Sequence, residues 1–395
     1  MPPLRRRRRI RGGFSGKVQA FRTVADRGSA LNGIKRMTDN VTLIVSIDTE
    51  CDNWNPARTG ITVANIRELP RLDRELERLG VRPTYFTTYQ VAVSGGSAGI
   101  IRALAQRQGV EIGAHLHPWN TPPIMFPLAS EKTMLANLPP VLQRDKIRTL
   151  TDALTELLGE RPLSFRAGRW GLDSSTVRAL IDCGYRVDSS VTPLRGWGED
   201  FGPSHVRAPL DVYRLDGTGS HLVPRANGQL IEVPTSWGYK QSQWGLARRI
   251  HSAIDRRILH RMRVFSLAAR LHVLNNIVLN PEAEPLPYMK LLVRRLVQRG
   301  VRHLHIAFHS SSLTPGLNPF AATKSDVERL YANLSALIES ICATHTVRFA
   351  TVDEAAELLA PPAIRSVSPE RTAASVDDRR SQAPIAADRS AGGLR

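Results

Sequence analysis

The segment EIGAHLHPWN, residues 111–120, places two of the chain's 11 histidines two positions apart, directly before a proline. Together with Val110, its residues alternate between apolar and other side chains, which is typical of a β-strand. Since successive side chains of a strand point to opposite faces, His115 and His117 share one face. The segment therefore predicts a strand whose carboxyl end delivers two imidazoles to one place.

Working outward, strand-like and helix-like stretches alternate on both sides of this segment. About eight such units favour an α/β fold, a distorted (β/α) barrel of about seven or eight parallel strands with helices outside. The expected strands are 42–48, 83–89, 110–117, 163–166, 185–191, 230–236, 303–309 and 347–352, and the expected helices are 66–79, 98–108, 145–158, 174–183, 288–299 and 325–343.

Two further strands end in ionisable residues. In SIDTECD, Asp48, Glu50 and Asp52 share a side if the extended conformation continues, and in HLHIAFH the same holds for His305 and His309. Carboxylates this close repel one another unless a cation or a protonation shift relieves them. Parallel barrels build their active sites at the carboxyl ends of strands, so we expect these groups to converge there.

Two imidazoles and a carboxylate at an open site suit a divalent transition metal, most readily Zn²⁺. For one isolated His-x-His pair, a satisfied polar residue in a loop would be the better interpretation. Three converging clusters favour a functional site instead.

The net charge of +18 lies mainly in two stretches of the chain, since residues 1–40 and 240–299 each carry +9. Residues 1–40 are expected to be a disordered basic leader, and residues 361–395 a disordered tail, on either side of a barrel domain at 41–360. Three widely spaced cysteines give no disulfide framework, no apolar run reaches about 20 residues, and no apolar segment follows the basic start. We therefore expect a cytoplasmic protein.

Residues 240–285 form an expected insertion in the barrel. Between 246 and 278, apolar residues recur every three or four positions with arginines between them, which predicts a basic amphipathic helix. Two interpretations stay open. The helix packs on the barrel with a solvated basic face, or it contacts anionic lipid at the inner membrane face or a lipid-linked sugar.

The motifs at these strand ends resemble those of the NodB-homology polysaccharide deacetylases, carbohydrate esterase family 4. Within that family the chain is most similar to the divergent WalW-type branch. The resemblance covers roughly residues 41–358. It implies that Asp48 of SIDTECD is the general base and that Glu50, with Asp52 as the alternative, binds the metal. It further implies that His115 and His117 of AHLHP complete the ligand set, although their spacing is shorter than the usual one.

The later motifs complete the resemblance. Arg166 of FRAGRW would hold the Asp48 carboxylate ionised, and His309 of IAFHS would be the general acid, titrating near neutral pH. Substrate-binding roles are implied for Trp170, Asp188 and Trp237.

The resulting hypothesis is metal-dependent hydrolysis of an N-acyl amide, expected to be N-acetyl, on an amino sugar of a cell-surface polysaccharide precursor. A water activated at the metal and Asp48 would attack the carbonyl, and His309 would protonate the leaving amine. The alternatives are a deformylase or small-molecule amidohydrolase on the same fold, and a degenerate, non-catalytic carbohydrate-binding module. Specific nucleic-acid binding is not expected, because no recognisable motif accompanies the basic segments.

Overall fold

The computed structural model describes residues 40–52, 61–124, 129–256 and 275–363. Its first strand, β1 (Asn40–Thr49), is apolar along most of its length and buried on both faces, as expected of a central parallel strand. Leu43, Val45 and Ile47 face the outer helices, whereas Ile44 faces the interior of the curled sheet. Ser46 and Asp48 share the parity of Ile44, so β1 directs a carboxylate inward at its carboxyl end.

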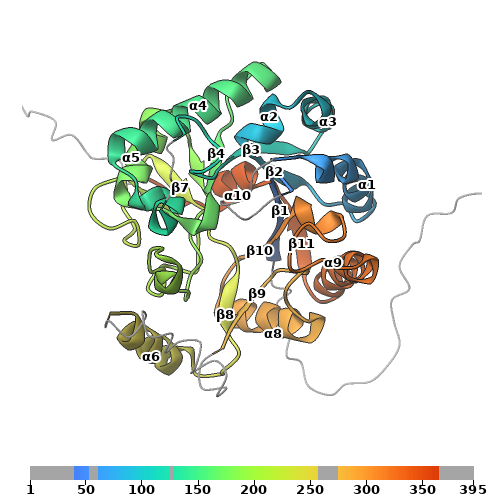
Figure 1. Cartoon of the computed structure of the whole chain (residues 1–395). Coiled ribbons are helices and arrows are strands. Elements are labelled where there is room, and N and C mark those ends of the chain that lie inside the picture. The colour runs from blue at the N-terminus through green and yellow to red at the C-terminus, as the bar shows by residue number, and fades with distance from the viewer. Residues whose placement is uncertain (1–39, 53–60, 125–128, 257–274, 364–395) are drawn as a thin grey trace, which may run out of the picture. The chain divides into compact units, whose positions relative to one another are not determined.

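Within the described residues the main sheet has nine strands, in the order β10-β1-β2-β3-β4-β5-β7-β6, with β11 also paired to β1. All of these pairs are parallel except the one between β6 and β7. The predicted distorted barrel of seven or eight parallel strands is confirmed (Figure 1). The other strands of this sheet are β2 (Pro83–Thr87), β3 (Glu111–Leu116), β4 (Ser164–Ala167), β5 (Val187–Asp188), β6 (Tyr213–Leu215), β7 (Leu230–Glu232), β10 (His303–His309) and β11 (Thr346–Phe349).

The helices follow the strands and cover the outside of the sheet with apolar faces, as their three-to-four-residue spacing predicts. α10 differs, because its Val352 and Ala356 pack with Ile44 inside the curl, and Figure 1 shows it among the strands. The α-helices are α1 (Leu69–Arg78), α2 (Tyr89–Val93), α3 (Gly95–Ala105), α4 (Pro140–Leu158), α5 (Ser174–Asp182), α6 (Trp244–Arg256), α8 (Leu286–Val297), α9 (Lys324–Thr344) and α10 (Val352–Leu359).

The gap between β7 and β10 is closed by irregular backbone. The Ser236 amide donates to the His305 carbonyl at 3.3 Å, and the Leu279 amide donates to the Ser236 carbonyl at 3.1 Å. Leu279 in turn accepts a hydrogen bond of 3.1 Å from the Ala307 amide. The expected strands 185–191 and 230–236 are therefore shorter than predicted, because only residues 187–188 and 230–232 keep regular pairing.

The insertion is only partly the predicted helix. α6 begins at Trp244, but residues 276–278 form β9 (Asn276–Val278), which pairs antiparallel with β8 (Trp237–Tyr239). The prediction of a helix to 278 is wrong at this end, because Ile277 buries its side chain in the core from a strand. Residues 257–274 lie outside the described residues, as do 1–39 of the leader and 364–395 of the tail; Asn40 already belongs to β1. Within the described residues, no helix is both long enough and apolar enough to span a bilayer.

Candidate active site

Strand register brings the predicted site residues together at one end of the sheet. Asp48 on β1 lies opposite His309 on β10, and His115 on β3 lies opposite Arg166 on β4. All four side chains lie near the carboxyl ends of their strands, which is where a parallel barrel gathers its functional groups.

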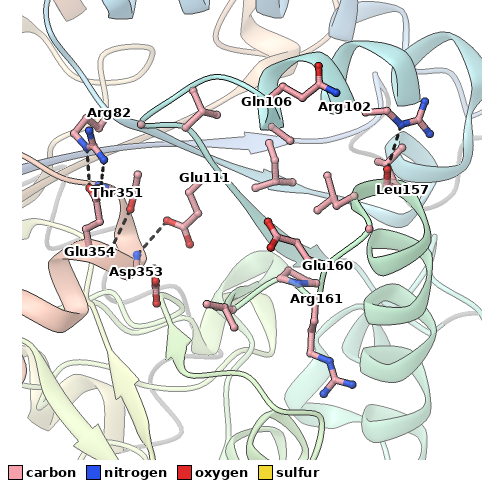
Figure 2. A pocket seen from close by; sticks show the side chains of 18 of the residues that line it. Arg82, Arg102, Gln106, Glu111, Leu157, Glu160, Arg161, Thr351, Asp353 and Glu354 are labelled. Carbon is pink, nitrogen blue, oxygen red and sulfur yellow. Dashed lines mark hydrogen bonds and ion pairs between the residues drawn. The ribbon is translucent and has the colours of Figure 1, made fainter.

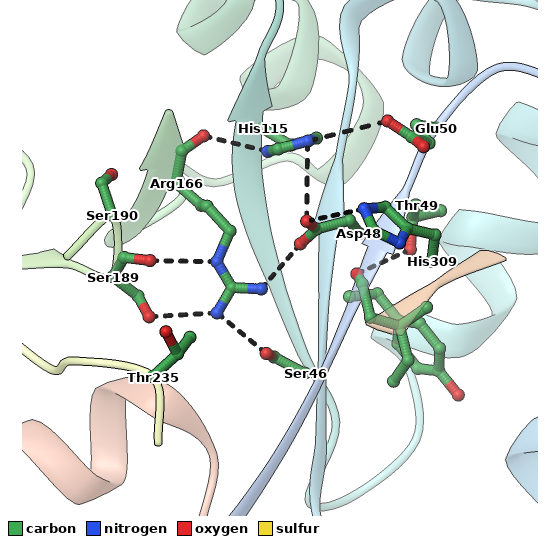
Figure 3. A network of polar contacts seen from close by, with 12 residues as sticks. Ser46, Asp48, Thr49, Glu50, His115, Arg166, Ser189, Ser190, Thr235 and His309 are labelled. Carbon is green, nitrogen blue, oxygen red and sulfur yellow. Dashed lines mark hydrogen bonds and ion pairs between the residues drawn. The ribbon is translucent and has the colours of Figure 1, made fainter. Parts of the chain in front are cut away.

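Arg166 is completely buried and holds Asp48 in place (Figure 3). Its Nη1 donates to Asp48 Oδ1 at 2.6 Å, its Nε donates to the Ser189 carbonyl at 3.0 Å, and its Nη2 donates to Ser46 Oγ at 2.9 Å. Burial by itself raises the pKa of Asp48, but the charge of Arg166, helped by His115 and His309, outweighs it and holds this pKa below its usual range. Asp48 is therefore ionised although its side chain is buried.

Glu50, His115 and His117 form a group whose potential ligand atoms all lie within 4.8 Å of one another. His117 Nε2 lies 2.9 Å from Glu50 Oε2, and His115 Nε2 lies 3.9 Å from the same oxygen. His115 Nδ1 lies 3.0 Å from the Arg166 carbonyl, which only a ring N–H can satisfy, so Nε2 turns its lone pair toward the carboxylates.

This group has the properties of a site for a divalent cation. Glu50 Oε1 and His117 Nδ1 are buried and have no hydrogen-bond partner in the described part of the chain. Burial raises the pKa of Glu50 to about 7 and lowers the pKa values of His115 and His117 to about 4 and about 3. Neutral imidazoles, one of them oriented by a backbone carbonyl, are the form in which histidine binds metals. The residues therefore fit a divalent metal.

Asp52, the alternative ligand, lies elsewhere. Its carboxylate accepts hydrogen bonds from Thr62 Oγ1 at 2.5 Å, from the Ala64 amide at 2.8 Å and from Asn65 Nδ2 at 2.6 Å. It thus fixes the start of the 3₁₀ turn η1 (Ala64–Glu68). The alternation that aligned it with Glu50 fails because β1 ends at Thr49.

His309 has a partner that the sequence did not reveal, Glu282. The ring Nδ1–H donates to Glu282 Oε1 at 2.6 Å, and Nε2 lies 3.8 Å from Asp48 Oδ2. Burial lowers the pKa of His309, but the Glu282 carboxylate, with smaller effects of Glu50 and Asp48, outweighs burial and raises this pKa to about 10. The expectation of a near-neutral His309 is therefore corrected, because a buried counter-ion stabilises the imidazolium. His305, also a candidate, instead contacts Ser46 Oγ at 2.8 Å.

A cavity of about 470 Å³ opens above these groups. Trp170, one of the predicted substrate-binding residues, lines it, whereas Asp188 and Trp237 do not. Asp188 is fully buried and accepts a hydrogen bond of 2.7 Å from Ser190 Oγ, and Trp237 packs edge-on against Trp197. Besides Asp48 and the metal-binding group, the lining consists of Cys51, Trp119, Met134, Ala167, Arg169, Trp170, Trp197, Asp200, His309 and Phe320.

The turn after β4 explains the glycine of FRAGRW. A Cβ on Gly168 would lie 2.2 Å from His117 Nδ1, so a side chain at this position would collide with the imidazole. The next two residues, Arg169 and Trp170, have φ values of 55° and 62°, and both side chains line the cavity.

A second cavity, of about 630 Å³, lies at the amino ends of the strands (Figure 2). Arg82 and Glu354 form an ion pair on its wall, and Glu111 accepts a hydrogen bond from the Asp353 amide at 3.1 Å. Among the described residues, the sole group of three or more possible metal ligands is the one at Glu50, so the chemistry is expected in the first cavity.

No family model matches the sequence, and no curated protein matches it. Among solved structures, the chain is similar to a putative polysaccharide deacetylase from Mycobacterium smegmatis, with 18% identity and a TM-score of 0.50 over 84% of this chain and 93% of that one. The two proteins share a fold. A probable polysaccharide deacetylase from Pseudomonas aeruginosa PAO1 is also similar, with 15% identity and a TM-score of 0.46 over 80% and 89% of the two chains. The likeness to the first of these structures confirms the predicted distorted (β/α) barrel fold. Membership of the NodB-homology family and of its WalW-type branch stays a prediction.

Proposed function

We propose that this protein is a metal-dependent hydrolase that removes an N-acyl group, acetyl in the first instance, from an amino sugar of a glycan. One observation carries the proposal. A buried carboxylate, Asp48, is kept ionised by Arg166 beside the Glu50, His115 and His117 group, and His309 lies on its other side.

In this mechanism Glu50, His115 and His117 would hold a divalent metal, which would polarise the amide carbonyl and lower the pKa of the attacking water. Asp48 accepts the proton of the attacking water. His309, protonated through its pairing with Glu282, gives a proton to the leaving nitrogen as the C–N bond breaks, so the products are a carboxylic acid and a free amine. Arg166 keeps the Asp48 carboxylate oriented and charged throughout.

The aromatic wall supports a sugar substrate. Trp170 and Trp197 lie with nearly parallel rings, 6.5 Å between centroids, and apolar ring faces of this kind pack against the C–H face of a pyranose. The deciding experiment incubates the zinc-loaded protein with N-acetylglucosamine oligosaccharides and measures acetate and free amine in equal amounts. Formate from N-formyl substrates alone would favour the deformylase alternative, and saccharide binding without either acid would favour the binding-module alternative.

We further propose that the glycan is a surface-polysaccharide precursor processed in the cytoplasm at the inner membrane face. Support comes from α6, which carries half-exposed Leu246 and exposed Arg248 and Arg249. The two arginines line a surface cavity of about 440 Å³ with Arg207. Anionic headgroups are attracted by such a face. Flotation with phosphatidylglycerol vesicles tests this part, and an Arg248→Glu/Arg249→Glu variant should lose the association if the face is responsible.

A further inference from the structure

The backbone that carries Arg169 is strained at the wall of the catalytic cavity. Arg169 and Trp170 both have positive φ, a conformation that is unfavourable for a non-glycine residue. Gly168 precedes them and passes against the ring of His117. The strained turn aims a guanidinium and an indole into the same cavity, and strain of this kind is commonly retained where the side chains have a function.

Arg169 differs from Arg166, its neighbour three residues earlier. Arg166 is fully buried and its guanidinium is committed to Asp48, Ser46 and Ser189. The Arg169 side chain is about one-third exposed. Among the described residues, its guanidinium makes one hydrogen bond, to Thr133 Oγ1, of the five that its N–H donors could make, and its side chain lines the cavity.

The acidic partner of Arg169 is loosely held. Asp200 Oδ1 lies 3.6 Å from Arg169 Nη2, beyond hydrogen-bond distance, and the Asp200 side chain is about half exposed. An ion pair with this geometry contributes little and is readily exchanged. Asp200 therefore places a carboxylate roughly where an incoming anion would lie.

Arg169 is also the one arginine among the described residues that line this cavity. The hydroxyl groups of a neutral sugar can accept hydrogen bonds from a guanidinium, but they provide no charged partner. Beside a carboxylate or a phosphate it makes paired, charge-assisted hydrogen bonds in a fixed fork.

We propose that Arg169 recognises an anionic group of the substrate, so that the cavity selects N-acylated saccharides bearing a carboxylate or phosphate over neutral ones. On binding, this group replaces Asp200 as the partner of the guanidinium. The proposal rests on the proposed function for its substrate class, and it names the feature that distinguishes good substrates from poor ones.

The test compares a neutral N-acetylglucosamine oligosaccharide with the same oligosaccharide carrying a C6 carboxylate and with one carrying a phosphate monoester. Affinity is measured by calorimetry on the zinc-loaded protein, and kcat/KM is measured by acetate release. We expect at least one of the two anionic forms to exceed the neutral form by ~10- to 100-fold in affinity and in kcat/KM. The preference should fall with added salt. A larger effect of carboxylate or of phosphate identifies which anion the cavity takes.

Arg169→Gln should bring the anionic-to-neutral ratio close to one, and Asp200→Asn should raise anion affinity several-fold by removing the competing carboxylate. The matched control is Arg225→Gln. Arg225 forms a similarly long and exposed pair with Asp216, 3.7 Å, but lies outside the cavity lining, so the ratio should not change. If Arg169→Gln does not fold, Arg169→Lys, which keeps the charge but loses the fork, should lower the ratio partially.

The proposal is overturned if the wild-type protein binds neutral and anionic saccharides equally, or if Arg169→Gln and Arg225→Gln give the same ratio. Because affinity is measured apart from turnover, the two proposals fail separately. Absence of acetate from every substrate overturns the hydrolase, whereas the binding ratio still decides the role of Arg169.

Discussion

Asp48 and His309 face each other across neighbouring strands with opposite charges, and each charge is stabilised by a buried partner. Arg166 stabilises the carboxylate and Glu282 stabilises the imidazolium. Acid and base are thus present together in the same pH range, which general acid–base catalysis requires. Neither Arg166 nor Glu282 lines the cavity, whereas Asp48 and His309 both do.

Asp48→Asn should lower kcat by about 10²- to 10⁴-fold, because the amide cannot accept a proton from water. The zinc content should remain close to that of the wild-type protein, since Asp48 lies outside the group of three closely spaced ligands. Acetate release and metal analysis on the same sample check this. Loss of the metal together with activity would contradict the assignment of Asp48 as base rather than ligand.

Glu282→Gln should move the alkaline limit of kcat/KM to lower pH, because it removes the main reason that the pKa of His309 is raised to about 10. The same ion pair also contributes to the free energy of unfolding. A raised pKa stabilises the fold fully below the unfolded value of about 6.5, and this contribution is lost as pH rises toward 10. The stability gap between wild type and variant should therefore shrink from pH 6 to pH 10, in urea titrations. A gap independent of pH would show that Glu282 acts through packing alone.

At the scale of elements, the turn after β4 lies between the candidate metal site and the wall of the cavity. Gly168 makes room for the His117 ring, and the two residues that follow point into the cavity. A methyl group added at Gly168 would therefore displace the ring of His117, while every candidate ligand residue keeps its identity.

Gly168→Ala should weaken zinc affinity by ~10- to 100-fold, as is typical when the surroundings that orient a ligand are disturbed. The control is Gly99→Ala in α3, where an added Cβ meets nothing within 4 Å and alanine favours the helix by about 0.5–1 kcal/mol. Competition with a chromogenic chelator measures both variants. Equal zinc affinity in the two would mean that the turn moves aside without disturbing His117.

The sequence predicted those features that follow from periodicity. Alternation of strands and helices predicted the barrel. The alternation of side chains along each strand placed His115 with the other candidate ligands and Asp48 on the inner face. The same alternation gave a wrong position for Asp52, because β1 ends at Thr49 and the extended conformation does not continue to Asp52. Glu282 and the cavity residues Trp197 and Phe320 lie in connecting segments, which have no period, so only the folded chain brings them to the site.

At the scale of the whole molecule, the candidate metal-binding group joins segments distant in the chain, since Glu50 follows β1 whereas His115 and His117 belong to β3 and its end. Zinc at 100 times its Kd should stabilise the folded protein by about 2.7 kcal/mol, provided that the unfolded chain does not bind it. Thermal unfolding with zinc and with chelator checks this, with a His115→Ala/His117→Ala variant as control. The same upward shift in that variant would place the metal elsewhere.

The pairing of β1 with β10 also has a consequence during synthesis. Asp48 finds its partner strand about 260 residues later in the chain. At about 5–20 residues per second, a ribosome needs roughly 13–50 seconds to make the intervening polypeptide. Throughout that interval an apolar central strand lacks one of its neighbours, and such an edge readily pairs with other nascent chains. Expression at lower temperature or with additional chaperones should therefore raise the yield of folded protein more than changes to the surface would.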